Sequence, residues 1–260
     1  MKAIKNPIQF LSKNYLNENC QFDISPGDTL HRDKLYDFDP FKADNLISSD
    51  TNQILFTVWF KDNFSQFIVR EIDCIILQNI NWKSFTISLV QSDNTQIQIA
   101  DYTDNEETNL FIKLEIPVRA GVISFDVTDT IDSVNEILAG QIRVCKFIMN
   151  LSATTESEVN PITDEGSLRT FDGSLVSWTN FEKWGAKVNI QNIKKEQYDL
   201  LKSFIKNDGY ITIIPWYEWE PKDIYECLIT RGKIGTYAVD RWSGLISQTL
   251  QLEAKEDAYN

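Results

Sequence analysis

The stretch from Ile72 to Leu89 constrains the fold of this chain more than any other segment. Its first part, Ile72–Leu77, is almost continuously apolar, and this pattern predicts a strand that is covered on both faces. A polar turn, Gln78–Asn81, follows, and a second strand then opens at Trp82. The apolar residues of this second strand alternate, at Phe85, Ile87 and Leu89. Alternation is typical of a strand with one face on the core and one in water, so we expect a β-sandwich built on this pair.

Short apolar segments with turn residues between them continue on both sides of this pair. The expected strands are Gln53–Phe60, Phe67–Val69, Thr95–Ala100, Leu110–Ile116, Val122–Val127 and Gln141–Met149. Many short strands without a long helix are typical of a sandwich or a barrel. We therefore expect an all-β sandwich or barrel over residues 21–150, preceded by an N-terminal arm, residues 1–20, whose apolar residues show no clean period.

A change of composition follows the expected sandwich. Residues 151–166 are poor in aromatic residues and rich in Ser, Thr and Glu, which predicts a linker between domains. Beyond it, strand-like segments flank one helical pattern, Ile193–Lys206, which Asn192 can cap. The expected fold is therefore mainly β: an N-terminal β-sandwich and, over residues 167–260, a small C-terminal β domain with one packed helix, residues 193–206.

The chain is acidic, and its charge argues against two classes of partner. Its formal net charge is −13 and its pI is about 4.6. Nucleic-acid phosphates need a basic face and anionic membranes attract basic segments, so we expect neither as a partner. No apolar run approaches the roughly 18 residues of a membrane span, and the N-terminus lacks the apolar run of a signal peptide. We therefore expect no membrane insertion, and folding in a cytoplasm.

The cysteines and the histidine give little support to a metal or catalytic centre. The four cysteines show no C-x-x-C spacing, so a zinc site lacks its usual ligand pattern. They are Cys20, Cys74, Cys145 and Cys227. Most of them sit in strand patterns, and we expect small buried side chains there. The single histidine, His31, lies in a charged, turn-rich segment without a nucleophile motif, so we expect an exposed loop residue.

Carboxylates gather in two places along the chain. Asp33, Asp37 and Asp39 are candidate ligands of a structural Ca²⁺ ion, because calcium takes hard oxygen ligands from such loops. The alternative is that they are solvated turn carboxylates. Glu218 and Glu220 offer the acid pair that a glycoside hydrolase needs, but residues two apart share a strand face by chance, and a hairpin tip is the alternative. We expect no enzyme and no other cofactor.

Tryptophan and asparagine residues suggest a sugar site. Aromatic faces match the apolar faces of pyranose rings, and Trp82 stands at the end of a loop, where a sandwich would expose it. The candidate ligand-binding residues are Trp82 with Asn79 and Asn81 of the same turn. The alternative is that a tryptophan at a strand start lies in the core. The same two interpretations apply to Trp59, Trp184 and Trp242.

The first half of the chain resembles the discoidin-like, galactose-binding jelly-roll family. The resemblance rests on the loop Leu35–Pro40, on the strand Ile54–Val58 and on the central pair Ile72–Asn79 with Lys83–Ile87. It implies a jelly-roll sandwich with this pair in its core. It also implies a carbohydrate-binding module that recognises host surface glycans, which is one of two functions that we consider.

The second half resembles the small split-barrel domain of tailed-phage tail and baseplate proteins, such as the distal tail family. The resemblance rests on the order of four pieces: Leu200–Phe204 with Gly209, the strand Tyr225–Ile229, then Gly232–Ile234, and the terminal Thr249–Glu253. It implies that residues 167–260 form a small C-terminal β-barrel-like domain with one packed helix. It also implies a structural virion protein of a tail, tail-tip or baseplate, assembled in the host cytoplasm. The implied partners are other copies of the chain and neighbouring tail proteins. This is the leading hypothesis, and glycan binding is its alternative.

Overall fold

A computed structural model describes the larger part of the chain. The described residues are 8–25, 35–36, 46–48, 53–132, 136–153, 157–159, 162–169, 175–207, 210–214, 224–229, 238–239 and 243–257. Most of them lie in strands, and the helix among them is α1 (Lys195–Asn207). The predicted mainly β fold is therefore confirmed. No helix within these ranges could span a membrane, since α1 has only 13 residues.

The chain divides into two compact units, and one is inserted into the other. Unit 2 covers residues 14–147, and unit 1 combines residues 1–13 with residues 148–260. This differs from the predicted order of arm (1–20), jelly roll (21–150), linker (151–166) and C-terminal domain (167–260). The reason is a long-range pairing: Phe10, in the predicted arm, lies opposite Ile213 in a sheet of unit 1. A local pattern cannot reveal a partner so far along the chain.

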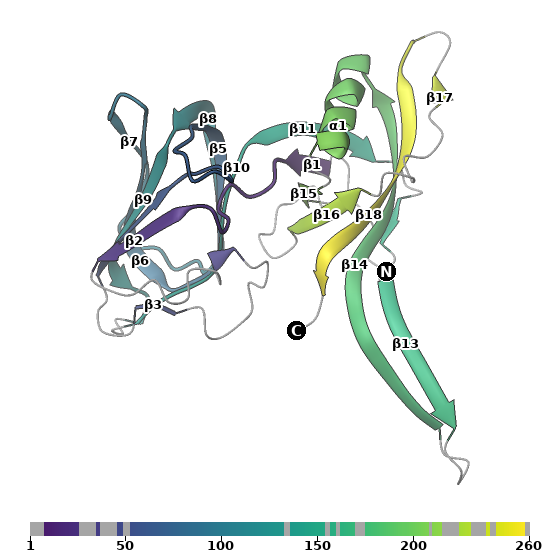
Figure 1. The fold of residues 1–260 in the computed structure, drawn as a ribbon, viewed down its shortest axis with the longest axis horizontal. Coiled ribbons are helices and arrows are strands. Elements are labelled where there is room, and N and C mark those ends of the chain that lie inside the picture. The colour runs from purple at the N-terminus through teal and green to yellow at the C-terminus, as the bar shows by residue number, and fades with distance from the viewer. Residues whose placement is uncertain are drawn as a thin grey trace. The chain divides into compact units, whose positions relative to one another are not determined.

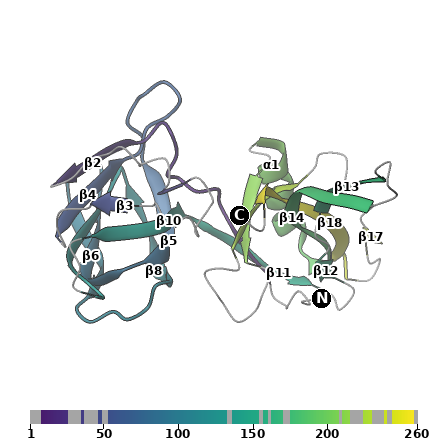
Figure 2. The same cartoon turned by 90° about the horizontal axis from the view of Figure 1, so that it is seen from below.

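Unit 2 is a sandwich of two antiparallel sheets. Its strands are β2 (Gln21–Ser25), β3 (Leu46–Ser48), β4 (Ile54–Trp59), β5 (Arg70–Ile80), β6 (Trp82–Val90), β7 (Gln96–Tyr102), β8 (Leu110–Ala120), β9 (Val122–Thr130) and β10 (Ile137–Cys145). One sheet has the order β3-β10-β5-β8 and the other the order β2-β4-β9-β6-β7. Figure 2 shows the two layers. The arrangement is that of the predicted jelly roll.

Alternating side chains from both sheets form one apolar core in unit 2. The central pair behaves as predicted: Ile72 to Leu77 of β5 are all buried, and so are Phe85, Ile87 and Leu89 of β6. Aromatic rings from neighbouring strands extend this core, with Phe56 stacked on Phe125 at a centroid distance of 5.5 Å. Burying a large apolar side chain contributes roughly 1.5–3 kcal/mol, so this pair is a main source of stability.

Unit 1 contains the remaining elements. They are β1 (Ile8–Leu11), β11 (Phe147–Ala153), β12 (Glu158–Val159), β13 (Ile162–Arg169), β14 (Leu175–Ile193), α1, β15 (Tyr210–Ile214), β16 (Tyr225–Ile229), β17 (Ala238–Val239) and β18 (Ile246–Asp257). The path β14-β11-β1-β15-β16-β18 closes on itself, because β18 also pairs with β14. A closed ring of strands leaves no open edge and encloses its own core. Unit 1 is thus the predicted barrel-like domain (Figure 1).

Most of the predicted linker lies in strands of unit 1. β11 extends to Ala153, β12 follows, and β13 begins at Ile162. All three pair with the 19-residue strand β14, whose backbone groups satisfy theirs. Composition alone therefore misidentified this segment, because Ser, Thr and Glu form strands where a paired partner is present.

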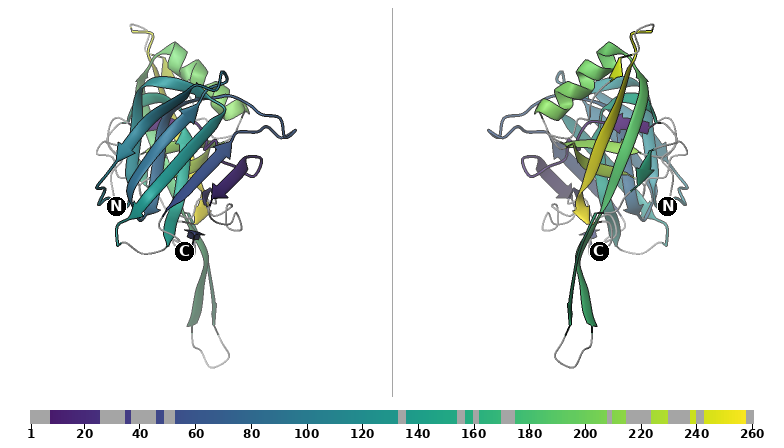
Figure 3. Two further views of the ribbon diagram at one scale, coloured as in Figure 1. Left: turned by 90° about the vertical axis from the view of Figure 1, so that its left-hand side faces the viewer. Right: turned by 90° about the vertical axis from the view of Figure 1, so that its right-hand side faces the viewer.

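β13 and the first half of β14 form a two-stranded ribbon. Their register runs from Ile162 opposite Lys183 to Arg169 opposite Leu175. From Gly185 onward β14 pairs with β18 instead and belongs to the barrel. Figure 1 and both panels of Figure 3 show the ribbon extending away from the barrel of unit 1.

The helix of unit 1 begins later than predicted. Ile193 is the last residue of β14, is fully buried and lies opposite Ile246 of β18. The helix starts at Lys195, and the side chain of Gln197 accepts the backbone N–H of Lys194, which is one half of a capping box. From this helix, Leu201 is buried in the core of unit 1, and Tyr198 packs against that core.

Candidate ligand-binding site

The predicted site residues lie together at the turn between β5 and β6, but Trp82 faces inward. Its side chain has no exposed surface. The ring meets Phe85 and Phe125 edge-on, at centroid distances of 5.5 and 5.8 Å. A ring enclosed in this way cannot stack on a sugar. Trp82 is therefore a core residue, because the first position of β6 falls on the inner face of the sheet.

The two asparagines of this turn differ: Asn79 is exposed, whereas the Asn81 side chain bonds to neighbouring backbone groups. Asn79 takes a left-handed conformation, with φ of 52°, which asparagine tolerates better than most residues. Asn81 donates from Nδ2 to the carbonyl of Glu136 at 2.8 Å and accepts the N–H of Leu138 at 2.9 Å. Both ends of the Asn81 amide are thus engaged in joining β5 to the start of β10.

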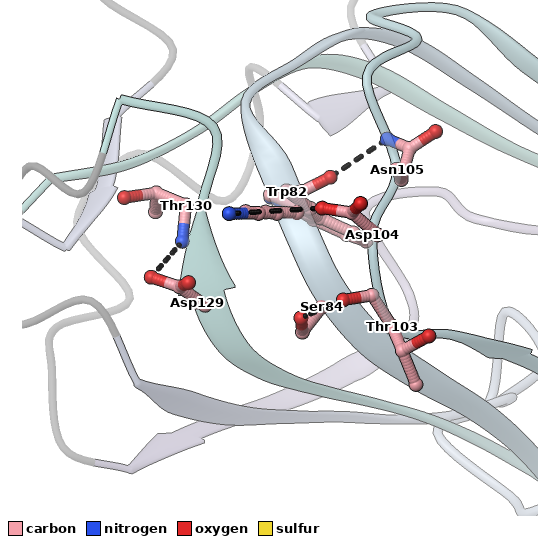
Figure 4. A network of polar contacts seen from close by, with 8 residues as sticks. Trp82, Ser84, Thr103, Asp104, Asn105, Asp129 and Thr130 are labelled. Atoms are coloured by element: carbon pink, nitrogen blue, oxygen red, sulfur yellow. Dashed lines mark hydrogen bonds and ion pairs between the residues drawn. The ribbon is translucent and has the colours of Figure 1, made fainter.

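Polar contacts tie the neighbouring loops around Trp82 (Figure 4). Asn105 is buried and donates to the carbonyls of Trp82 and Glu107, each at 2.7 Å. Ser84 donates to the carbonyl of Thr103 at 2.8 Å. A short network of this kind satisfies loop backbone groups that would otherwise be buried without partners. Of the predicted site residues, Trp82 and Asn81 are therefore engaged within unit 2, and Asn79 stays exposed.

The segment on the other side of β5 exposes aromatic rings instead. Phe64 is 84% exposed and Phe67 is 65% exposed, and both lie in the loop between β4 and β5. Figure 2 shows this loop, in blue, reaching beyond the strands of unit 2. Phe67 had been expected in a strand, Phe67–Val69, but it makes only an isolated bridge to Lys61. We call residues 61–67 the aromatic hairpin.

Hydrogen bonds fix the aromatic hairpin in one shape. The carboxylate of Asp62 accepts the N–H groups of Phe64 and Gln66, each at 2.9 Å. The backbone of Asp62 donates to the carbonyl of Gln66 at 2.9 Å and accepts the N–H of Ser65 at 3.0 Å. At the base of the loop, Ile68 donates to Phe60 at 3.0 Å. The rings are thus held on an ordered turn and not on a loose loop.

The other side chains of the hairpin combine two charged residues, Lys61 and Asp62, with uncharged polar residues. Lys61 places its Nζ 4.7 Å from the centroid of Phe67, a cation–π contact that occupies one face of that ring. Asn63 accepts a hydrogen bond from Asn19 at 3.0 Å. Asn63 and Gln66 are exposed, so the hairpin offers amide donors and acceptors beside aromatic faces.

Sequence reasoning missed the aromatic hairpin, although a signal was present. The run Asp62-Asn63-Phe64-Ser65 holds three residue types that favour turns, because their side chains bond to nearby backbone N–H groups. Reading that signal predicts a turn before Phe67 and so an aromatic residue outside the sheet. The apolar triplet Phe67–Val69 outweighed it in the pattern.

Several other predicted residues lie outside the described ranges. They are His31, Asp33, Asp37, Asp39, Glu218, Glu220 and Trp242. The Ca²⁺ site and the hydrolase pair therefore stay predictions. Within the described ranges, no three His, Cys, Asp or Glu side chains gather closely enough to hold a metal ion. The four cysteines are buried thiols, as expected for those in strand patterns.

Comparison with known proteins returns solved structures only. No family model and no curated protein matches the chain. The family 32 carbohydrate-binding module from Streptococcus pneumoniae EndoD is 13% identical, with 50% of this chain and 97% of that chain covered and a TM-score of 0.41. The family 32 module of Clostridium perfringens NanJ, solved with galactose, is 12% identical, with 52% and 98% covered and a TM-score of 0.39.

A third match has the same character. Chitosan-binding module 1 from a chitosanase/glucanase of Paenibacillus sp. IK-5 is 11% identical, with 50% of this chain and 97% of that chain covered and a TM-score of 0.39. These three similar structures are carbohydrate-binding modules. At these identities and TM-scores they carry no argument about what this chain binds.

Proposed function

We propose that this protein is a non-catalytic carbohydrate-binding protein whose unit 2 holds sugar rings against Phe64 and Phe67. The observation that carries the proposal is the exposure of these two rings, 84% and 65%, on a turn fixed by hydrogen bonds. Large apolar side chains held in water on an ordered turn favour a ligand that covers them. The ordered turn also lowers the conformational entropy lost on binding.

The chemistry of the aromatic hairpin favours a sugar among the ligands that could cover it. Aromatic faces match the apolar faces of pyranose rings, and exposed amides such as those of Asn63 and Gln66 bond well to hydroxyl groups. The chain carries a net charge of −13, which disfavours the approach of an anionic ligand. The resemblance of the sequence to galactose-binding jelly rolls leads to the same ligand class.

The test is a printed array of neutral and acidic oligosaccharides, galactose and chitosan oligomers included, probed with the full chain. The test variant combines Phe64→Ala with Phe67→Ala. The matched control combines Leu55→Ala with Ile116→Ala, which are also exposed apolar residues, at 47% and 76%, but lie on β4 and β8. We expect the control to bind like the unchanged chain and the test variant to lose at least about tenfold in affinity.

Two results would overturn this proposal. One is an array on which the unchanged chain binds no glycan. The other is a dimer of the full chain that dissociates when Phe64 and Phe67 are replaced, because the rings would then cover each other in a second copy. Light scattering of the same samples measures the second outcome.

A second candidate function is a structural part of a virion tail, and the ribbon of β13 and β14 favours it. Isolated two-stranded ribbons are marginally stable in water, and their outer edges can pair with another chain. A neighbouring subunit that pairs with this ribbon would stabilise it, as expected for a repeated assembly. In that assembly, unit 2 would be carried as an inserted module between β1 and β11.

A shortened ribbon separates the two functions. Ile162 and Lys183 lie opposite each other, so a two-residue Asn-Gly turn can join them in place of residues 163–182. If the ribbon assembles the protein, light scattering and electron microscopy will show oligomers or rings for the unchanged chain and monomers for the shortened one. A monomeric unchanged chain at all concentrations, alone and with its neighbouring gene products, would argue against this candidate. Glycan binding by unit 2 should persist in both chains.

A further inference from the structure

We infer that Asp62 is the positioning residue of the aromatic hairpin, which holds Phe64 and Phe67 in their binding arrangement without touching the ligand. The inference rests on the proposed function, since it concerns the same site. Asp62 is suited to this role because both its side chain and its backbone bond within the turn. Asp62 is half-buried, whereas residues 63–67 of the hairpin are exposed.

The contacts of Asp62 span the turn that carries Phe64. Its carboxylate oxygen Oδ1 accepts from the N–H groups of Phe64 and Gln66, so one atom fixes the backbone on both sides of Ser65. Charged acceptors form stronger hydrogen bonds than neutral ones. Replacing the carboxylate therefore releases two N–H groups to water together, and the segment between them gains conformational freedom.

Ser65 shows why the turn needs such support. Its φ is 61°, in the left-handed region that residues other than glycine, asparagine and aspartate seldom occupy. The hydrogen bonds of Asp62 to the residues before and after Ser65 offset this strain. Without them, Ser65 would return to ordinary backbone angles, and Phe64 would move relative to Phe67.

The ring of Phe67 is held by a contact that does not involve Asp62, so this ring serves as an internal control. Lys61 lies over Phe67 at the base of the hairpin. The bridge between Lys61 and Phe67 is made by their backbones, so replacing Asp62 leaves it in place. Replacing Asp62 by alanine should therefore disorder the tip of the hairpin, with Phe64 and Gln66, and leave its base intact.

The experiment compares Asp62→Ala, Asp62→Asn and Ser65→Gly in the full chain. Binding is measured on the oligosaccharide array described above, and hydrogen exchange reports the Phe64 and Gln66 amides. We expect Asp62→Ala to lose roughly tenfold in affinity and to lose protection at both amides. Asp62→Asn keeps the acceptor oxygen and should stay within about threefold of the unchanged chain. Ser65→Gly relieves the strained φ and should bind within about twofold.

The outcomes distinguish this inference from the proposed function. If the unchanged chain binds but Asp62→Ala binds equally well, the positioning role is wrong and glycan binding stands. Unchanged exchange of the Phe64 and Gln66 amides in Asp62→Ala also overturns the inference, whatever binds. An equal loss in Asp62→Ala and Asp62→Asn, with both amides still protected, would place Asp62 in contact with the ligand instead. If the unchanged chain binds no glycan, the proposed function fails and this inference fails with it.

Discussion

The segments before and after β5 both carry aromatic residues, and they place them in opposite surroundings. Before β5, Phe64 and Phe67 stand in water on a turn held by Asp62. After β5, Trp82 is fully enclosed. The difference follows from backbone position: Trp82 opens a strand on its inward face, whereas Phe64 lies in a turn that has no inward face. An aromatic residue near a loop is therefore a weak guide to a binding site until its strand register is known.

The two segments also differ in what their polar side chains bond to. Around Trp82, the side chains of Asn81 and Asn105 bond to backbone groups of neighbouring loops. In the aromatic hairpin, Asp62 alone satisfies much of the turn, and the amide of Gln66 stays exposed. The segment after β5 uses the amides of Asn81 and Asn105 in its own hydrogen bonds, and the aromatic hairpin leaves Gln66 at the surface.

The largest expected effect on stability comes from replacing Trp82, the enclosed ring in the segment after β5. Trp82→Ala leaves a cavity beside Phe85 and Phe125 and should lower the free energy of unfolding by about 3–5 kcal/mol. Urea denaturation of the full chain measures it. Any fraction that remains folded should still bind the glycan. A variant of normal stability that has lost binding would restore Trp82 as a stacking residue.

A smaller effect compares two asparagines. Asn105→Ala removes hydrogen bonds to Trp82 and Glu107 in a buried place and should lower the free energy of unfolding by about 1–3 kcal/mol. Asn63→Ala, on the exposed hairpin, should change it by no more than about 0.5 kcal/mol. Thermal and urea unfolding of both variants check this. Equal changes in the free energy of unfolding would mean that both asparagines stabilise the fold to the same extent.

Cys74 lies on β5, the strand between the two segments, and its buried thiol should make the free energy of unfolding depend on pH in the alkaline range. Burial, followed by the nearby Asp73 carboxylate, raises the pKa of its thiol above the ordinary value of 9.0. The unfolded chain then loses this proton at a lower pH than the folded chain. Stability is therefore full below about pH 9 and falls above it, by up to about 1.4 kcal/mol per pH unit. Cys74→Ala should remove this part of the fall, and an identical alkaline slope would contradict it.

The smallest stability effect belongs to the hairpin rings themselves. Phe64→Ala and Phe67→Ala should each change the free energy of unfolding by no more than about 0.5 kcal/mol, because the rings are exposed. Their effect should appear in binding and not in folding. Urea midpoints measured beside the array data show both. A loss of stability near that of Trp82→Ala would mean that the rings pack against the protein in solution.

Local patterns in the sequence predicted much of unit 2. The continuous apolar run of β5 is buried, and the alternation of β6 places Phe85, Ile87 and Leu89 in the core. These features depend on residues within one strand, since alternate side chains take opposite faces. The mainly β fold, with a sandwich followed by a smaller β domain that carries a packed helix, follows from repeating that reasoning along the chain.

The tertiary structure decided what depends on distant partners. β1 belongs to the barrel because it pairs with β15, and the predicted linker forms strands because β14 pairs with it. The candidate ligand-binding residues are Phe64 and Phe67, and not Trp82 as the sequence predicts, for a related reason. Strand register and turn hydrogen bonds set which rings face water, and both arise from contacts between segments that no single window of sequence contains.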